Sequence, residues 1–356
     1  MKKIGVVLVN FKDYAQKYLS EFRDGILAQD YPREFVNYYM VDNSSSDPSR
    51  KYLGENFPEA VIIPRKDGNY ALANNVGAKK AFEDGCEYIV IANLDTSFDK
   101  SWLSELVKAL ELNKEAGIAQ SKILLYPKTR EEVIEPKINT LGNIMHFLGF
   151  GFTSAYNEKD RELDGYPEIK GYASGCSFII RKEVFEKIGG YDGEYYMYHD
   201  DIEVSWKTKL LGYKIILAPK SIIYHKYEFS RSIRMLYYME RNRYLVIFQF
   251  YSLLTLFLIM PAILVMEFGM VFFSIVNSWF GIKTKVGFYF LYPSTWLKIF
   301  KKRMFLKNIR KVREKMIIKH FVGEVLFQEI SSPVLKYVAN PLLNLYWKII
   351  KIFIVW

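Results

Sequence analysis

The sequence predicts an α/β fold, in which a mostly parallel sheet is flanked by helices and followed by a C-terminal helical, membrane-associated region. Three observations lead to this prediction. Short β-rich segments alternate with helical patterns through the first half of the 356 residues. Polar residues follow the ends of those segments. After Tyr244 the composition changes, and a long apolar stretch is followed by a basic one.

The β-rich segments and helical patterns follow one another in order. MKKIGVVLVN begins like a signal peptide, but Asn10, Lys12 and Asp13 interrupt the apolar run, which favours a buried first strand. Strands are expected at 4–9, 35–41, 60–64 and 87–93. Helices are expected from the four-residue spacing of apolar residues over 14–26, before Pro32, and over 71–82. This alternation is typical of a parallel sheet.

The rest of the chain divides into two regions. From 117 to 228 shorter strands and loops surround one clear helix, Ile202–Leu211, which ends near Gly212. We therefore expect one α/β domain over 1–230, whose two parts cover 1–116 and 117–230. A helical membrane-associated region is expected over 231–356.

The C-terminal region has an apolar segment, 244–282, in which Glu267 is the only charged residue. The basic segment that follows, 283–320, holds twelve Lys or Arg against one acid, Glu314. Basic residues on both sides favour an interfacial or re-entrant hairpin, while a single crossing, a buried hairpin and a dimer interface stay open. Nucleic acid is not expected, because the sequence carries no recognition motif.

Composition indicates where in the cell the chain is expected. The apolar fraction of 50% and the aromatic fraction of 17% exceed what a fully water-exposed globule needs. The two cysteines, Cys86 and Cys176, form no CxxC pair, so neither a disulfide framework nor a cysteine zinc site is expected. A reducing compartment fits, and with the net charge of +10 gathered near the C-terminus we expect the cytoplasmic face of the cell membrane.

Two acidic residues at strand ends are candidates for a ligand-binding site. Asp42 opens a polar loop and could accept hydrogen bonds from a nucleobase or ribose, although an acid before serines is also an ordinary turn or cap residue. Asp95 ends the apolar run after Asn93, where a carboxylate, a hard cation and a diphosphate could meet. A solvated turn is the alternative for Asp95.

A second acidic constellation lies at the start of the 202–211 helix. Asp200, Asp201 and Glu203 gain from the helix dipole, which is the structural interpretation. Asp200 and Asp201 also repel one another, and this raises one pKa, as suits a base that takes a hydroxyl proton. His225, after the next strand, is either a surface histidine or a metal ligand.

In this order, the segments resemble family 2 glycosyltransferases with the GT-A fold, a Rossmann-like sheet, and most closely the rhamnosyltransferase-like bacterial branch. The likeness spans about residues 3 to 245. It rests on VVLVNFKD, VDNSSSD (41–47), NLDTSFDKSWL (93–103), GCSFIIRKEVFEKIGGYDGEYYMYHDDIEVSWKTKLLGYKI (175–215) and YYMERNRY (237–244).

The resemblance implies that 1–230 is the catalytic domain, with a nucleotide-sugar-binding part over 1–116 and an acceptor-binding part over 117–230. It also implies roles for named residues. Asp201 is implied as the catalytic base, with Asp200 beside it. The nucleotide-sugar-binding residues are Asn10, Asp42, Asn69, Asn75, Asn93 and Asp95. The acceptor-binding residues are Gly175, Cys176, Asp200, Trp206 and Arg241. The ligands of Mg²⁺ or Mn²⁺ are Asp95 and His225. Asn93 stands where many relatives have a first aspartate, and the segment after Gly68 lacks the extra glycines of relatives.

The implied reaction is an inverting, metal-dependent sugar transfer from a UDP- or dTDP-linked donor to a lipid-linked saccharide acceptor, in polysaccharide or glycan assembly. The signature of processive synthases is absent, which favours one or a few additions per acceptor. A sugar nucleotidyltransferase is disfavoured because its Gly-rich loop is missing after the first strand. An inactive membrane scaffold with the same fold is the alternative, and a homo-oligomer stays open.

Overall fold

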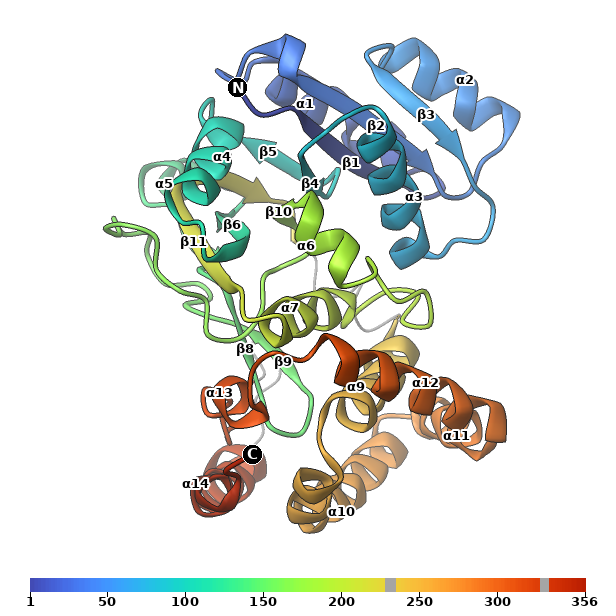
Figure 1. Ribbon diagram of the computed structural model, residues 1–356, viewed down its shortest axis with the longest axis vertical. Coiled ribbons are helices and arrows are strands. Elements are labelled where there is room, and N and C mark those ends of the chain that lie inside the picture. Colours follow the sequence, from blue (N-terminus) through green and yellow to red (C-terminus); the bar gives the residue numbers. More distant parts are fainter. Residues whose placement is uncertain (228–234, 327–332) are drawn as a thin grey trace. The chain divides into compact units, whose positions relative to one another are not determined.

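The computed structural model describes residues 1–227, 235–326 and 333–356 (Figure 1). The chain forms two compact units. The first comprises Met1–Asn143, Thr153–Thr208 and Tyr213–Tyr227, and the second Ile144–Phe152, Lys209–Gly212 and Glu228–Trp356. The segments Ile144–Phe152 and Lys209–Gly212 thus join the second unit although they precede the boundary expected near residue 230. Contacts in space decide their place, and sequence order does not reveal such contacts.

The first unit is built on a nine-stranded sheet with the order β3-β2-β1-β4-β10-β6-β11-β5, and β7 pairs with β6. The strands are β1 (Ile4–Asn10), β2 (Val36–Asp42), β3 (Ala60–Pro64), β4 (Tyr88–Ala92), β5 (Thr96–Phe98), β6 (Ala116–Leu125), β7 (Ile138–Thr140), β10 (Ser177–Arg181) and β11 (Lys214–His225). Strands β1 to β4 pair in parallel, as do β6 and β11, whereas β10 runs antiparallel between β4 and β6. The four predicted strands are confirmed.

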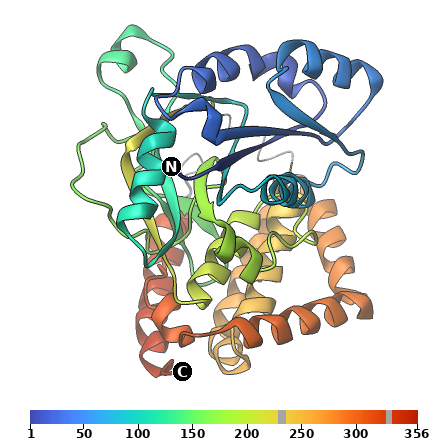
Figure 2. The ribbon, with the colours of Figure 1, turned by 45° about the horizontal axis from the view of Figure 1, so that its top comes forward.

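Helices cover both faces of this sheet. They are α1 (Tyr14–Leu27), α2 (Asp47–Asn56), α3 (Tyr70–Glu83), α4 (Trp102–Leu112), α5 (Arg130–Ile134), α6 (Lys182–Lys187) and α7 (Asp200–Leu210), with a 3₁₀ turn, η1 (Arg33–Phe35). Ile4, Val6 and Leu8 of β1 point into one core that α1 and α4 complete. Because side chains alternate along a strand, Val7 faces the other side, where α3 lies. Figures 1 and 2 show α3 opposite α1 and α2 across the sheet.

Glycines let α3 approach the sheet closely. A Cβ on Gly77 of α3 would lie 2.4 Å from Cγ1 of Val7, and a Cβ on Gly5 would lie 2.5 Å from Cβ of Ala81. Both distances are shorter than any real carbon contact, so glycine at these positions sets the spacing of helix and strand. This spacing places the first turn of α3 beside the carboxyl ends of the strands.

We expect Gly77→Ala to destabilise the first unit by about 1–3 kcal/mol, because the added methyl group overpacks the contact with Val7. The matched control is Gly54→Ala in α2, where a Cβ meets only Cδ1 of Ile62, at 3.9 Å. That change should leave stability equal or raise it by up to about 1 kcal/mol, since alanine favours helix. Denaturant unfolding of both variants checks this, and equal midpoints would contradict the packing argument.

The second unit is helical apart from a short hairpin. Its elements are β8 (Asn143–Met145, which begins at the last residue of the first unit), β9 (Gly151–Thr153, which ends in the first unit), α9 (Leu236–Phe250), α10 (Leu253–Val276), α11 (Phe280–Leu291), α12 (Pro293–Ile309), α13 (Glu314–Ile318), a π-helical turn, η2 (Leu335–Ala339), and α14 (Asn340–Phe353). Arg243 and Glu240 of α9 form ion pairs with Glu267 of α10 and Lys283 of α11. The C-terminal helical region that the sequence predicts is confirmed.

Helix α10 is the feature of this unit with the strongest apolar character. It is 24 residues long, has a mean hydropathy of 2.3 in its most apolar window, and buries 17% of that window. Length and composition alone would let it cross a membrane. Pro261 lies inside the helix without ending it, so residues 253–276 form one continuous helix.

Candidate active site

The carboxyl ends of β1 and β2 carry the first pair of predicted residues. Asn10 and Asp42 are register partners, and both side chains are buried. Nδ2 of Asn10 donates to Oδ1 of Asp42 at 2.9 Å, and Oγ of Ser49 donates to Oδ2 at 2.6 Å. Ser49 belongs to the capping box that begins α2, so helix α2 and strand β1 together fix the Asp42 carboxylate. This carboxylate forms the inner wall of a polar loop.

Asn69, the N-cap of α3, and Asn75 within α3 tie the helix to the loop after α6. Nδ2 of Asn69 donates to the Gly193 carbonyl at 2.8 Å, while its Oδ1 caps α3 by accepting from Leu72. Asn75 makes two bonds of 2.8 Å with the backbone of Tyr191, one donated and one accepted. Both side chains thus position a loop that leads to the acids of α7. Their roles toward a nucleotide-sugar stay a prediction.

Asp95 and His225 lie together at the edge of the sheet. Asp95 follows β4, and His225 ends β11 opposite Thr96 of β5. Nε2 of His225 is 3.5 Å from Oδ2 of Asp95, and Nδ1 is 3.3 Å from Oδ1 of Asn139. When Nδ1 carries the proton and donates it to the Asn139 amide oxygen, Nε2 is the nitrogen that can bind a cation beside Asp95. Asn139 had no signal in the sequence that could have found it.

This oxygen and nitrogen pair suits a divalent cation. Burial lowers the pKa of His225, but Cys176 and Asp95 raise it to a net value well above the usual one, so the position favours positive charge. Across the described ranges no group of three or more His, Cys, Asp or Glu side chains is arranged for a metal ion. The residues fit a cation that takes two protein ligands and completes its shell with diphosphate oxygens and water.

Asp200 and Asp201 begin α7 after a strained loop. Tyr196, Tyr198 and His199 have φ of 65°, 62° and 59°, in the left-handed region that residues with side chains seldom adopt. Strain of this kind persists where the surrounding structure demands a particular backbone path. Here it delivers two adjacent carboxyl groups to the helix start.

The two carboxyl groups differ in their surroundings. Burial raises the pKa of Asp201 to about 6, and hydrogen bonds from the backbone amides of Gly175 (3.3 Å) and Ile202 (2.9 Å) limit the rise. Burial, and then the charge of Asp201, raise the pKa of Asp200 to about 8. At neutral pH Asp201 is therefore mostly ionised, and Asp200 mostly protonated. The sequence predicts one raised pKa, and the structure shows two.

Glu203, the third acid, has a different role. Its carboxylate forms an ion pair of 2.7 Å with Lys207, one turn later on α7, and both side chains are fully buried. Nζ of Lys207 also donates to the Gly190 carbonyl. Breaking a buried pair by removing one partner costs about 3–5 kcal/mol, so this pair anchors α7 to the loop after α6. Glu203 belongs to the support of the site.

Backbone and side-chain bonds join the acidic pair to the Asp95 region. Gly175, whose amide contacts Asp201, precedes Cys176, whose carbonyl accepts from the Asn93 amide at 3.0 Å. The hydroxyl of Tyr70, at the start of α3, donates to Oδ1 of Asn93 at 3.0 Å. The Tyr70 pKa is raised by burial and then by the Asp200 charge, so this ring lies near both constellations. One site therefore contains the ends of β4, β11, α3 and α7.

With this geometry, comparison with known proteins identifies the family. The family model for Glycosyl transferase family 2 matches residues 6–189, just over half of the chain. The chain belongs to glycosyl transferase family 2. The resemblance seen in the sequence and the predicted GT-A fold class are thereby confirmed.

Two bacterial relatives of this family 2 chain extend the match. It is 24% identical over 212 residues to the N-acetylglucosaminyl-diphospho-decaprenol L-rhamnosyltransferase of Mycobacterium tuberculosis, across 54% of this chain and 67% of the relative. It is 27% identical over 237 residues to the O-antigen biosynthesis protein RfbC of Myxococcus xanthus, across 63% of this chain but 17% of that longer protein. The first name agrees with the predicted rhamnosyltransferase-like branch.

Solved structures resemble the chain more distantly. The structure of GalNAc-T7 with UDP, GalNAc and Mn²⁺ has a TM-score of 0.49 at 14% identity, and covers 64% of this chain and 44% of that one. The structure of S. aureus TarS residues 1–349 with UDP has a TM-score of 0.46 at 14% identity, and covers 68% and 65%.

The remaining predicted acceptor residues of the family 2 chain are buried. Trp206 lies inside α7 at 3% exposure, and the Cys176 thiol lies beside the His225 ring, where burial raises its pKa. Arg241 belongs to the second unit, where its guanidinium lies 5.1–5.6 Å from the ring centroids of Tyr237, Tyr238 and Tyr289. The acceptor roles of these three residues stay predictions.

Tyr191 is a site residue that the sequence analysis missed. Among the described residues its buried hydroxyl has no hydrogen-bond partner. Burial, followed by the charges of Tyr70 and the two aspartates, raises its pKa. A buried hydroxyl without a hydrogen-bond partner lowers the stability of the fold. Tyr191 is therefore a candidate for a hydrogen bond with substrate.

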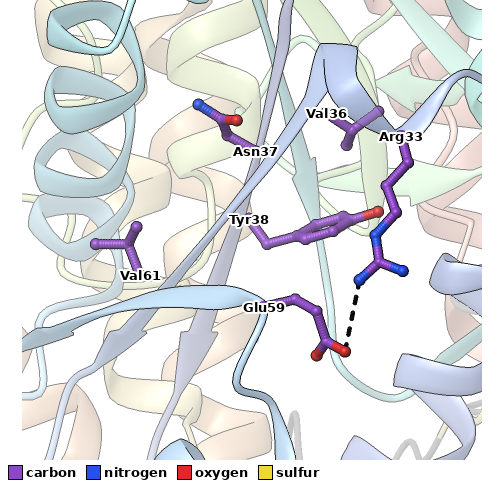
Figure 3. Close-up of a pocket in the computed structure, with 6 residues that line it drawn as sticks. All are labelled: Arg33, Val36, Asn37, Tyr38, Glu59 and Val61. Carbon is purple, nitrogen blue, oxygen red and sulfur yellow. Dashed lines mark ion pairs between the residues drawn. The ribbon is translucent and has the colours of Figure 1, made fainter.

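A hollow elsewhere on the first unit does not belong to this site. Its volume is about 360 Å³, and Figure 3 shows its lining, with the Arg33 guanidinium 3.6 Å from the Glu59 carboxylate. The lining residues are Arg33, Val36, Asn37, Tyr38, Glu59 and Val61. They stand at the amino ends of β2 and β3, whereas ligands of parallel α/β sheets bind at the carboxyl ends.

Proposed function

We propose that this chain is an inverting, metal-dependent glycosyltransferase that moves a sugar from a nucleoside diphosphate to a hydroxyl of a lipid-linked saccharide. The acceptor oxygen attacks the anomeric carbon as its proton passes to the Asp201 carboxylate. The bond from that carbon to the diphosphate breaks, and the nucleoside diphosphate leaves with the electron pair. A single displacement inverts the anomeric configuration.

The observation that carries this proposal is the environment of Asp201. A general base works best when its pKa lies near the operating pH, because it is then both ionised and sufficiently basic. Burial gives Asp201 a pKa of about 6, while Gly175 and Ile202 hold the carboxylate in place. Asp200, mostly protonated at neutral pH, is able to donate a hydrogen bond to an acceptor hydroxyl beside the base.

The donor side rests on two pairs of residues. Asn10 and Asp42 form a buried polar pair that suits a nucleobase or ribose. Asp95 and His225 would hold Mg²⁺ or Mn²⁺ on the diphosphate of a UDP- or dTDP-linked sugar. The cation would supply Lewis-acid stabilisation of the charge on the leaving diphosphate. Asn93, fixed by Tyr70 and Cys176, stands next to that position.

The names of two relatives support the proposed acceptor class. The mycobacterial relative is named for a diphospho-decaprenol-linked sugar, and the other for O-antigen biosynthesis. A lipid-linked acceptor and a place at the cytoplasmic face of the cell membrane agree with the apolar and basic helices of the second unit. Rhamnose is the sugar that the first name suggests.

The test is a donor screen followed by a transfer assay. Nucleoside diphosphate sugars with Mn²⁺ are screened for thermal stabilisation, since a bound ligand raises stability with the logarithm of its concentration over Kd. We expect one donor to raise the melting temperature, and nucleotide release only when lipid-linked saccharide is added. The product anomer, read by NMR, should be opposite to that of the donor. Binding without release for any donor and lipid extract would indicate an inactive scaffold.

A further inference from the structure

Exposed apolar side chains are concentrated on three helices of the second unit. On α10 they recur every three or four residues along the whole helix, and Phe257 and Phe268 are 78% and 80% exposed. The exposed members are Leu253, Leu254, Phe257, Met260, Leu264, Val265, Phe268, Phe272, Ile275 and Val276. The buried residues Thr255, Ile259, Ala262, Ile263 and Ser274 form the opposite stripe. Helix α10 therefore lies lengthwise on its unit.

Helix α14 lies beside α10 and repeats the pattern. The hydroxyl of Tyr346 donates to the Leu258 carbonyl of α10 at 2.6 Å, so the two helices touch (Figure 1). One face of α14 is buried through Leu343, Trp347 and Ile350. Its outward face carries Leu342, Leu345, Ile349, Ile352 and Phe353, each 48–69% exposed. Two neighbouring helices thus present apolar faces much larger than soluble monomers usually expose.

Exposed lysines accompany exposed apolar residues on α12 and α14. Helix α12 exposes Leu297, Phe300 and Met304 with a spacing of three and four residues. On the same helix Lys298, Lys301 and Lys307 are exposed, and Lys348 is exposed on α14. Aromatic and aliphatic residues beside lysines are typical of helices that lie in the interface of an anionic bilayer. Two copies meeting through these faces would bring their lysines together, which disfavours self-association.

Ionic contacts tie α10 to its unit along its length. At its start the Ser252 amide donates to the Glu314 carboxylate at 2.8 Å. In its second half Glu267 pairs with Arg243 of α9 at 2.9 Å and with Lys283 of α11 at 2.7 Å. If α10 crossed the bilayer, these charged partners and their helices would have to enter the hydrocarbon with it, which is unfavourable.

From these contacts we infer that the second unit is monotopic: α10 and α14 lie in the plane of one leaflet of an anionic membrane, with the lysines of α12 and α14 at its headgroups. The inference concerns membrane binding alone and holds whether or not the chain transfers sugar. It decides among the interfacial hairpin, the crossing and the buried interface that the sequence left open.

The first experiment measures binding of the full chain to preformed vesicles by flotation. We expect binding to vesicles with anionic lipid and much weaker binding to zwitterionic ones. Phe257→Glu with Phe268→Glu should lower binding at least about 100-fold, because two buried rings become charges. The matched control is Val133→Glu with Ile134→Glu, two exposed apolar residues of the first unit. Equal losses in both variants would overturn the assignment of the face.

A second pair of variants tests how much the lysines of α12 contribute to membrane binding. Lys298→Glu, Lys301→Glu and Lys307→Glu together should weaken binding to anionic vesicles on the order of 100-fold, since each lysine near the surface contributes roughly a fivefold factor. Reversal of three exposed lysines of the first unit, Lys51, Lys79 and Lys114, changes net charge equally and should leave binding nearly unchanged. Equal weakening would mean that net charge alone drives binding.

The second experiment separates lying in the leaflet from crossing it. Lys315→Cys marks the start of α10, beside Glu314, and Asn277→Cys marks its end; both positions are exposed. The native cysteines are buried. On protein bound to sealed vesicles, a membrane-impermeant maleimide added outside should label both sites. Labelling of Asn277→Cys only after detergent would establish a crossing. If the chain did not bind vesicles but self-associated, and if the Phe257 and Phe268 changes abolished that self-association, the apolar face would belong to an interface with a second copy.

Discussion

Asp201→Asn is expected to reduce sugar transfer by about 10² to 10⁴, the usual contribution of a positioned base. The amide keeps the shape of the side chain but cannot accept the acceptor proton. Binding of the nucleotide-sugar should stay within about threefold of the wild type, since the proposed role of Asp201 concerns the acceptor. Turnover with saturating donor, and donor affinity by calorimetry, are the measurements. Retained turnover would remove Asp201 from the role of base.

Asp200→Asn is the matched control, one residue away on the same helix start. Because burial and Asp201 raise the pKa of Asp200 to about 8, its carboxyl is mostly protonated at pH 7, and asparagine resembles that neutral form. Transfer should therefore fall by about tenfold or less. An acid whose pKa is raised by folding costs stability as pH rises above its unfolded value near 4. The Asn variant, free of this cost, should melt at a higher temperature at pH 7.

The pH dependence of the wild type tests the same assignment. Since Asp201 must be ionised to accept a proton and its pKa is about 6, transfer should fall tenfold per pH unit below about 6. Above that value the rate should be flat until Asp200 ionises near pH 8. A profile with its acid limb near pH 4 would contradict the raised pKa.

Asp95→Asn is expected to have an effect of similar size. Removing the carboxylate from the proposed cation site leaves His225 as the one predicted protein ligand, and we expect transfer to fall by at least about 10³, in line with several kcal/mol of Lewis-acid stabilisation. Donor affinity measured with Mn²⁺ and with EDTA should become equal, whereas the wild type should bind the donor far more tightly with Mn²⁺. A preserved difference would place the cation elsewhere.

Asp42→Asn is the control variant for the comparison of donor affinity with Mn²⁺ and with EDTA. It lies in the same sheet edge but contacts Asn10 and Ser49, away from His225. Donor affinity should fall by about tenfold both with Mn²⁺ and with EDTA, so that the ratio of the two affinities is unchanged. Two variants that weaken the donor equally but differ in this ratio separate a role on the cation from a role on the nucleoside.

Local sequence predicts much of the framework. Strands β1 to β4 and helices α1 and α3 follow from the sequence pattern, because a buried strand reads as a continuous apolar run and a helix as a spaced one. Helix α2 was not predicted. The acids at strand ends follow from the same logic, since the carboxyl ends of parallel strands share one edge. Asp42 and Asp95 are therefore predicted from strand ends, and Asp200 and Asp201 from the start of a helix.

Other features depend on residues far apart in the chain. Asn139 supports His225 across the sheet, and Tyr70 joins the start of α3 to Asn93. Neither has a local pattern, because a hydrogen-bond partner is chosen by proximity in space. Asn69 and Asn75 were predicted to bind the nucleotide-sugar, and in the structure their side chains hydrogen-bond to the loop around Gly193 and Tyr191.

By itself, the sequence determined the family resemblance, the α/β class, the candidate acidic residues and the apolar and basic character of the C-terminal region, because these depend on residue type and spacing. Only the tertiary structure decided which acid is ionised. Asp200 and Asp201 are identical in chemistry and adjacent in sequence, yet burial and two backbone amides give them pKa values of about 8 and 6. The pKa of a side chain depends on its burial and on neighbouring charges and hydrogen bonds, and the folded structure sets all of these.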